Sequence, residues 1–232
     1  MSIPSAIPGH TLDWKTNFRD TDSKPWASIF GVWGPATAGG GVDDDYEPSQ
    51  VTVDTLHGNC SIVCRQHADG HRVSGGVGSY KAKPLTAGLW VVRARIISSG
   101  SIDSVLLGWP ERSAGAESWP VGQEFDFVET NPVYDHTSYS TTLHHGADNS
   151  QIQAHAAMNF DVGQFHTYYL QVVPGVSIST WADSFGGLAV TTVESPLVNA
   201  EPHYLVAENL AQGRCTVGTM VLTHASQWSV AA

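Results

Sequence analysis

Basic side chains are scarce in this 232-residue sequence, which has 11 Lys and Arg against 22 Asp and Glu. Charged residues make up only 14% of the chain, compared with roughly 25% in an average soluble protein. The formal net charge is −11 with histidine counted as neutral. Proteins that bind nucleic acids or anionic membranes present basic patches, so we expect neither partner. A neutral polymer or a small neutral ligand is compatible with this charge.

Long apolar runs and cysteines are also few. No segment approaches the roughly 20 apolar residues of a membrane-spanning helix, so we expect no membrane insertion. Three cysteines do not make a disulfide framework. Cys60 and Cys64 fall in one predicted strand, where a spacing of four positions puts them roughly 13 Å apart, too far for a local bridge. We expect buried thiols, and a bridge from Cys215 to one of them remains an alternative.

The sequence does contain many short segments rich in Val, Ile, Thr, Tyr and Phe, separated by Gly, Pro, Asn, Asp and Ser. Such segments favour a pleated, half-buried sheet, and no window shows a capped helical period. With 41% hydrophobic residues, the pattern predicts an all-β sandwich, jelly roll or barrel. We expect one domain over 1–232, with an irregular segment 1–50 packed on it. The predicted strands are 60–65, 89–97, 103–109, 124–130, 138–145, 165–173, 176–183, 187–193, 203–209 and 216–224.

An acidic run, GGGVDDDYEP, occupies residues 39–48. We interpret it as a solvated loop. Clustered carboxylates such as Asp43, Asp44 and Asp45 would also suit calcium, although the run lacks the spacing of a calcium-binding loop. Zinc-ligand spacings are missing too. We therefore expect no cofactor and no metal in the functional site, and leave a structural calcium ion open.

The segment SWPVGQEFDFVET, residues 118–130, holds the most informative pattern. In a strand, Glu124 and Asp126 share one face and the alternating phenylalanines share the other. A regular strand would then turn Glu129 into the core, where a lone carboxylate is costly. A β-bulge near Phe127-Val128 would restore Glu129 to the acidic face. We therefore expect three carboxylates on one face of one strand.

Such an arrangement suits the hydrolysis of glycosidic bonds. Retaining glycosidases hold a carboxylate nucleophile and a carboxylic acid/base about 5–5.5 Å apart. Asp126, between the two glutamates, could keep one of them ionised and the other protonated. The alternative is an acidic exposed strand face without chemistry.

The motif and its flanks resemble the family 16 glycoside hydrolases, jelly-roll endo-glycanases that act on β-glucans and related galactans. The family signature is a Trp-Pro pair, a short gap, a glycine and E-x-D-x-x-E, here Trp119, Pro120, Gly122, Glu124, Asp126 and Glu129. The resemblance implies a two-sheet antiparallel jelly roll with a concave glycan-binding cleft. It also implies that Glu124 is the nucleophile, Asp126 the assisting carboxylate and Glu129 the acid/base. The longer spacing is similar to that of the laminarinase and agarase branches.

Weaker matches follow the family order over roughly residues 89–224. TTLHHG, 141–146, is similar to the family's T-L-H-Y-G strand, and PHYLVAENLAQG, 202–213, to its P-x-x-L-I-L-N-L-A-x-G-G strand. The family's L-W-P-A-F-W stretch is replaced by IDSVLL, 102–107, which lacks both tryptophans. We therefore expect rebuilt sugar subsites.

Three further residues are candidates for substrate binding. Trp119 and Trp109 offer planar rings that could stack on sugar faces. His144 falls on the face of its predicted strand opposite Leu143 and could reach and tune the carboxylates. A cleft histidine with satisfied hydrogen bonds and no catalytic role is the alternative for His144.

The sequence thus predicts a retaining endo-glycanase that cleaves internal β-linkages of a β-1,3-glucan, a related galactan or a cell-wall glycan. The alternative is a non-catalytic carbohydrate-binding or structural module, such as a phage virion or tail surface protein with virion proteins as partners. The first ten residues lack the basic and apolar segments of a secretory signal peptide, which motivates this alternative. We expect an extracellular or virion-associated protein.

Overall fold

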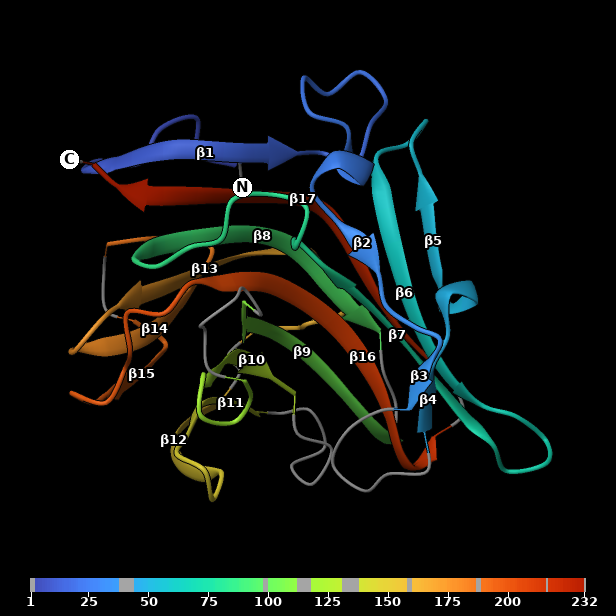
Figure 1. Ribbon diagram of the computed structural model, residues 1–232. Helices are drawn as coiled ribbons and strands as arrows, with labels where there is room; N and C mark the ends of the chain where they lie inside the picture. The colour runs from blue at the N-terminus through green and yellow to red at the C-terminus, as the bar shows by residue number, and fades with distance from the viewer. Residues whose placement is uncertain are drawn as a thin grey trace.

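The computed structural model describes residues 3–37, 44–97, 100–111, 118–130, 138–157, 160–186, 189–215 and 217–231. Two antiparallel β-sheets stack in this part of the chain, and long strands such as β8 and β16 bend along their length (Figure 1). The described helices are two three-residue 3₁₀ turns, η1 (Trp26–Ser28) and η2 (Pro48–Gln50). Neither of them could cross a membrane.

The first sheet is built around β17, which pairs with β8 along one edge. On its other edge β17 pairs with β1 at one end and with β6 at the other. The strands are, in spatial order, β15 (Thr191–Glu194), β14 (Ser177–Ala182), β13 (His166–Val173), β8 (Gly88–Ile97), β17 (Val217–Val230), then β1 (His10–Thr16) and β6 (Asn59–Gln66), with β5 (Val51–Asp54) beside β6.

The second sheet carries the candidate site. Its strands are, in spatial order, β2 (Gly31–Val32), β7 (Arg72–Gly78), β16 (His203–Cys215), β9 (Gly100–Pro110), β10 (Glu124–Glu129), β11 (Ser138–His145) and β12 (Ser150–Ala157). Strand β7 also pairs with β6 and, in parallel, with β4 (Asp44–Tyr46), which pairs with β3 (Ala36–Thr37). The two sheets are therefore connected at this end.

The core lies between the sheets because alternate side chains of each strand point inward. Trp90 of β8 and Leu170 of β13 meet Leu106 of β9 and Phe125 of β10, and all four are fully buried. A smaller apolar layer covers the other face of the first sheet, where Trp181 and Trp228 pack together with Ile7. One face of the second sheet is thus used for packing, and the other is available for a site.

The predicted all-β sandwich is confirmed, and each of the ten predicted segments overlaps a strand. The expectation of an irregular segment 1–50 is wrong in part, because β1 and short strands β2 to β4 lie in it. Strands β5, β7 and β12 were not predicted either. β7 is glycine-rich (RVSGGVG), and β12 (SQIQAHAA) has small and polar residues that are exposed on alternate positions.

The cysteines agree with the expectation of buried thiols as far as the structure describes them. Cys60 and Cys64 lie on the same side of β6 and are fully buried. Burial raises the pKa of the Cys60 thiol to about 12, so this thiol stays protonated and unreactive. The side chain of Cys215 lies outside the described residues.

Candidate active site

Strand β10 contains the bulge that the sequence predicts. Asp126 lies opposite Leu107 of β9, and the pairing resumes with Val128 opposite Leu106, which leaves Phe127 as the extra residue. The pairing with β11 shifts at the same place, between Asp126 and Glu129. The prediction of a bulge near Phe127-Val128 is confirmed.

The bulge is held from inside the sandwich. The carbonyl oxygen of Phe127 accepts hydrogen bonds from the hydroxyls of Thr141 (2.8 Å) and Thr180 (2.9 Å). Phe127 and Val128 both pack into the core. Two consecutive inward side chains change the parity of the strand, so Glu124, Asp126 and Glu129 all point away from the core. We call the side of the second sheet that carries these three residues the carboxylate face.

Each glutamate is held by donors from its neighbours. The indole Nε1 of Trp119 donates to Glu124 Oε2 at 2.6 Å. Glu129 Oε2 accepts hydrogen bonds from the hydroxyls of Ser140 (2.9 Å) and Thr142 (3.2 Å), both on β11. Both glutamates are half-buried, so each is oriented by protein donors while it remains open to a ligand.

His144 joins this group from β11, where it lies directly opposite Glu124. Its Nε2 atom is 3.0 Å from Asp126 Oδ2, and its Nδ1 atom is 2.9 Å from Asn149 Oδ1. The imidazole therefore bridges the central carboxylate of the motif and the turn after β11. The structure thus brings together Glu124, Asp126, Glu129, Trp119 and His144.

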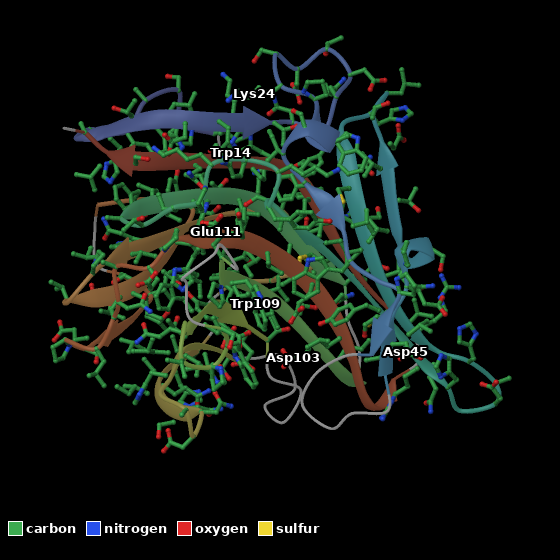
Figure 2. The ribbon with its side chains drawn as sticks, viewed as in Figure 1. Trp14, Lys24, Asp45, Asp103, Trp109 and Glu111 are labelled. Atoms are coloured by element: carbon green, nitrogen blue, oxygen red, sulfur yellow. The ribbon has the colours of Figure 1, made fainter. Side chains whose placement is uncertain are left out.

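Two further carboxyl groups lie on the same face, and sequence reasoning missed both. Asp103 of β9 is 4% exposed and hydrogen-bonds Glu129, and it lies on the same strand as Trp109 (Figure 2). Glu208 of β16 is 6% exposed and accepts a 2.6 Å hydrogen bond from the Tyr46 hydroxyl. Asp103 lies in the mostly apolar segment IDSVLL, which has no alternating period that would have placed this carboxyl group on the site face; the register of β9 with β10 and β16 places it there.

Burial changes the protonation of this cluster. It raises the pKa of Asp126 well above its usual range, and the nearby charges of Glu129 and Glu208 raise it further. Burial and the neighbouring carboxylates raise the pKa of Asp103 in the same way. Burial and Asp126 also raise the pKa of Glu124, while His144 and the Trp119 hydrogen bond partly oppose this. The cluster therefore retains protons at pH values where isolated carboxyl groups are ionised.

An aromatic pocket of about 240 Å³ lies next to the carboxylates and is lined by Trp33, Tyr80, Trp109, Pro110, Tyr204 and Val206. The rings of Trp109 and Trp119 are nearly parallel, with centroids 6.3 Å apart. The Trp33 ring meets Trp109 edge-on at 6.1 Å. Trp119 is 37% exposed and joins this aromatic surface to the carboxylates. Sequence reasoning found Trp109 and Trp119 but missed Trp33, because it lies far away in the sequence.

The acidic run offers little to a metal ion in the part that can be described. Asp43 and the side chain of Asp44 lie outside the described residues. Asp45 Oδ2 lies 3.7 Å from His71 Nε2. Among the described residues there is no group of three or more His, Cys, Asp or Glu side chains placed to hold a metal ion.

Solved structures with the same fold include laminarinases and β-glucanases. The laminarinase catalytic domain from Thermotoga maritima MSB8 is similar over 96% of this chain and 99% of its own, with a TM-score of 0.76 and 16% identity. SCLam, a non-specific endo-β-1,3(4)-glucanase from family 16, covers 100% of this chain and 94% of its own, with a TM-score of 0.76 and 20% identity.

A third structure shows a protein of this fold with bound glycan. LamA from Z. galactanivorans, solved in complex with laminaritriose and laminaritetraose, has a TM-score of 0.74 and 17% identity. It covers 94% of this chain and 98% of its own. No family model and no curated protein matches the sequence. The chain has the fold of the family 16 glycoside hydrolases, and the resemblance seen in the sequence is confirmed at the level of the fold.

Proposed function

We propose that this protein is a retaining endo-glycanase that cleaves internal β-linkages of a polysaccharide, a β-1,3-glucan or a related galactan. The observation that carries the proposal is the bulged strand, which presents Glu124, Asp126 and Glu129 on one face. The bulge places two consecutive side chains, Phe127 and Val128, in the core and returns Glu129 to the open face, where its carboxylate is not buried alone. The shared fold of known laminarinases supports the same reaction class.

In the proposed reaction Glu124 is the nucleophile and Glu129 the general acid/base. Glu129 protonates the leaving glycosidic oxygen while Glu124 attacks the anomeric carbon and forms a covalent glycosyl-enzyme. Glu129 then takes a proton from a water molecule, which releases the sugar and restores both carboxyl groups. The hydroxyls of Ser140 and Thr142 hold Glu129 in position through both steps.

Asp126 assists between the two glutamates. It hydrogen-bonds Glu124 and lies 3.0 Å from His144 Nε2, and it is 3% exposed. Burial and the charges of Glu129 and Glu208 raise its pKa, whereas the hydrogen bond with Glu124 lowers it, because Glu124 donates this bond to the Asp126 carboxylate and the two groups share a proton. This bond keeps Glu124 in place and limits the repulsion between neighbouring carboxylates.

Substrate binding is assigned to the aromatic surface beside the carboxylates. Trp109 and Trp119 present ring faces that suit the apolar faces of sugars. His144, predicted as a further substrate contact, has both ring nitrogens on Asp126 and Asn149, so it is assigned to positioning the carboxylates. The similar solved structures give no support to the alternative of a phage virion protein.

A reducing-end assay tests the proposal. The wild-type protein and Glu124→Gln are incubated with laminarin, mixed-linkage glucan and agarose, with the exposed Glu194→Gln as a matched control. New reducing ends are expected from the wild type and from Glu194→Gln, and none from Glu124→Gln. Proton NMR of the first product should show the β-anomer, because two displacements retain the configuration.

Two outcomes would contradict the proposal. Full activity of Glu124→Gln would remove the assigned mechanism. If the wild type released no reducing ends from any polymer but its migration was retarded in gels that contain the same polymers, the protein would be a non-catalytic carbohydrate-binding module instead.

A further inference from the structure

A second pocket, of about 480 Å³, gathers most of the lysines of this acidic protein. The sequence has four lysines, and three of them, Lys24, Lys81 and Lys83, line this pocket together with Asp13. The pocket lies between β1 and the segments 24–29 and 81–83. Lys24 and Trp14 lie near β1, whereas Asp103 of the candidate active site lies on β9 (Figure 2).

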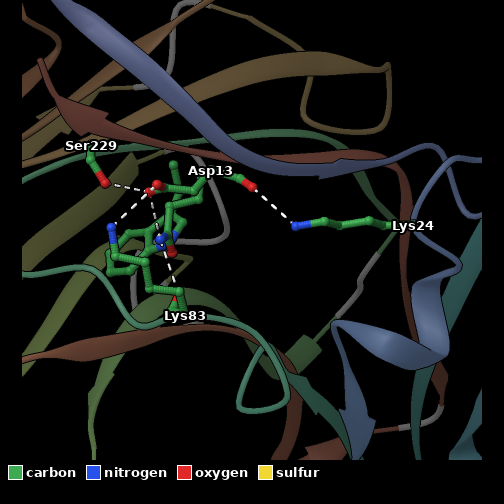
Figure 3. Close-up of polar contacts among 6 residues, drawn as sticks. Asp13, Lys24, Lys83 and Ser229 are labelled. Atoms are coloured by element: carbon green, nitrogen blue, oxygen red, sulfur yellow. Dashed lines mark hydrogen bonds and ion pairs between the residues drawn. The ribbon is translucent and has the colours of Figure 1, made fainter.

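Asp13 is already occupied by internal donors. Its carboxylate accepts hydrogen bonds from the Ser229 hydroxyl and from Gln227 Nε2 (3.0 Å), and it pairs with Lys83 Nζ at 3.4 Å (Figure 3). Burial raises the pKa of Asp13, but these hydrogen bonds and Lys83 outweigh burial and lower the pKa below its usual value. Asp13 and Lys83 therefore form a neutral pair.

The other two lysines are bound by main-chain oxygens. Lys24 Nζ donates to the carbonyl oxygen of Asp13 at 3.2 Å (Figure 3), and Lys81 Nζ donates to that of Ala27 at 3.2 Å. A carbonyl group fixes an ammonium without cancelling its charge, and an ammonium has three N–H donors. Lys24 and Lys81 thus present two fixed positive charges and further donors to the pocket, without an ion pair to any carboxylate among the described residues.

We propose that this pocket binds an oxyanion, a sulfate, phosphate or carboxylate group, between Lys24 and Lys81. Such a group accepts several charge-assisted hydrogen bonds from ammonium donors. A net charge of −11 repels anions from the protein as a whole, whereas Lys24 and Lys81 give this pocket a local positive charge. The proposal is independent of the proposed hydrolysis, because the two lysines lie outside the carboxylate face.

The oxyanion could be a free ion or a substituent on a polymer. Tyr80 lines the aromatic pocket. Lys81 and Lys83 follow Tyr80 in the same segment and line the second pocket, which holds the lysines. The two pockets therefore share one segment of the chain, and a charged substituent on a glycan bound at the aromatic surface is one source of the oxyanion to be tested. Both sources offer the same chemistry to Lys24 and Lys81.

Calorimetric titration with sodium sulfate tests the site, with ionic strength held constant by sodium chloride. The wild type should bind sulfate saturably with one site per chain. Lys24→Gln/Lys81→Gln should weaken binding at least about tenfold, as expected for lost hydrogen bonds between charged groups. Lys15→Gln, the remaining and exposed lysine outside the pocket, should change it less than about twofold.

The side chains of Lys24 and Lys81 are exposed, so the double variant should keep the thermal midpoint of the wild type. It should also keep any activity on neutral laminarin. Absence of saturable sulfate binding by the wild type would overturn the proposal. An equal loss of binding in Lys15→Gln would also overturn it, because the effect would then report net charge alone.

Gel electrophoresis separates the two sources of the anion. Gels are cast with agarose or with a sulfated galactan, which share a galactan backbone. Stronger retardation by the sulfated polymer that Lys24→Gln/Lys81→Gln removes would assign the site to a polymer substituent. Equal migration in both gels, combined with sulfate binding in the titration, would assign it to a free anion.

Discussion

The bulge in β10 should depend on two threonine hydroxyls that reach it from other strands. Thr141 and Thr180 both donate to the Phe127 carbonyl oxygen, and both are fully buried. Valine has nearly the same shape as threonine but no hydroxyl. Thr180→Val leaves Thr141 as a donor to the carbonyl oxygen, whereas Thr141→Val/Thr180→Val removes both hydroxyls.

The expected cost follows from the hydrogen bonds. Loss of one neutral hydrogen bond costs about 1 kcal/mol, while a buried polar group left without a partner costs on the order of 1–3 kcal/mol more. We expect about 1 kcal/mol for Thr180→Val and about 3 kcal/mol or more for the double variant. For a chain of this length, Thr180→Val should lower the thermal midpoint by about 2–4 °C, and the double variant should lower it by at least about 6 °C.

Urea unfolding followed by tryptophan fluorescence measures these free energies, and the cleavage rate of the best glycan reports the position of Glu129. Thr141 also shares a 2.5 Å hydrogen bond with Thr191, so Thr191→Val is the control for that bond. The double variant should lose more stability than the summed losses of Thr141→Val and Thr180→Val, and its cleavage rate should fall. Additive losses with an unchanged rate would refute the idea that these hydroxyls hold the bulge.

Three other predictions concern the charged cluster. His144→Gln should move the acidic limb of the pH profile of kcat/KM to higher pH, because His144 lowers the pKa of Glu124; an unmoved limb would contradict this. Burial raises the pKa of Asp103 in the folded state above its unfolded value of about 3.9. The protonated group therefore stabilises the fold fully below the unfolded pKa, and this stabilisation is lost as the pH rises through the folded pKa. The thermal midpoint of Asp103→Asn, which has no such proton to lose, should therefore fall less than that of the wild type between about pH 4 and pH 7, and parallel curves would argue against the buried proton. Trp119→Phe removes the hydrogen bond to Glu124 and should lower kcat at least about tenfold, with little change in stability because Trp119 is 37% exposed; a normal kcat would disprove its positioning role.

Much of the site could be predicted from the sequence because it depends on one strand. The alternation of side chains fixes which face Glu124 and Asp126 share. The cost of burying a lone carboxylate then requires an extra residue before Glu129, and the register with β9 and β11 shows that residue. These are local constraints, and they act within six residues of chain.

The residues around this strand were harder to predict from the sequence. His144 was expected to reach the carboxylates from a neighbouring strand, and it lies opposite Glu124. Asp103 and Glu208 were not expected at the site. They come together because β9 pairs with both β10 and β16, an arrangement that links residues about a hundred positions apart in the sequence.

By itself, the sequence determined the all-β class, the strands with strong alternation and the bulged carboxylate strand, because these depend on side-chain period and on the cost of burying charge. The tertiary structure alone decided which strands are neighbours: β1 lies beside β17, and Trp33 reaches Trp109. It also decided that three lysines from two distant segments share one pocket. Strand order and loop placement result from the packing of the whole sandwich, for which no short segment carries a signal.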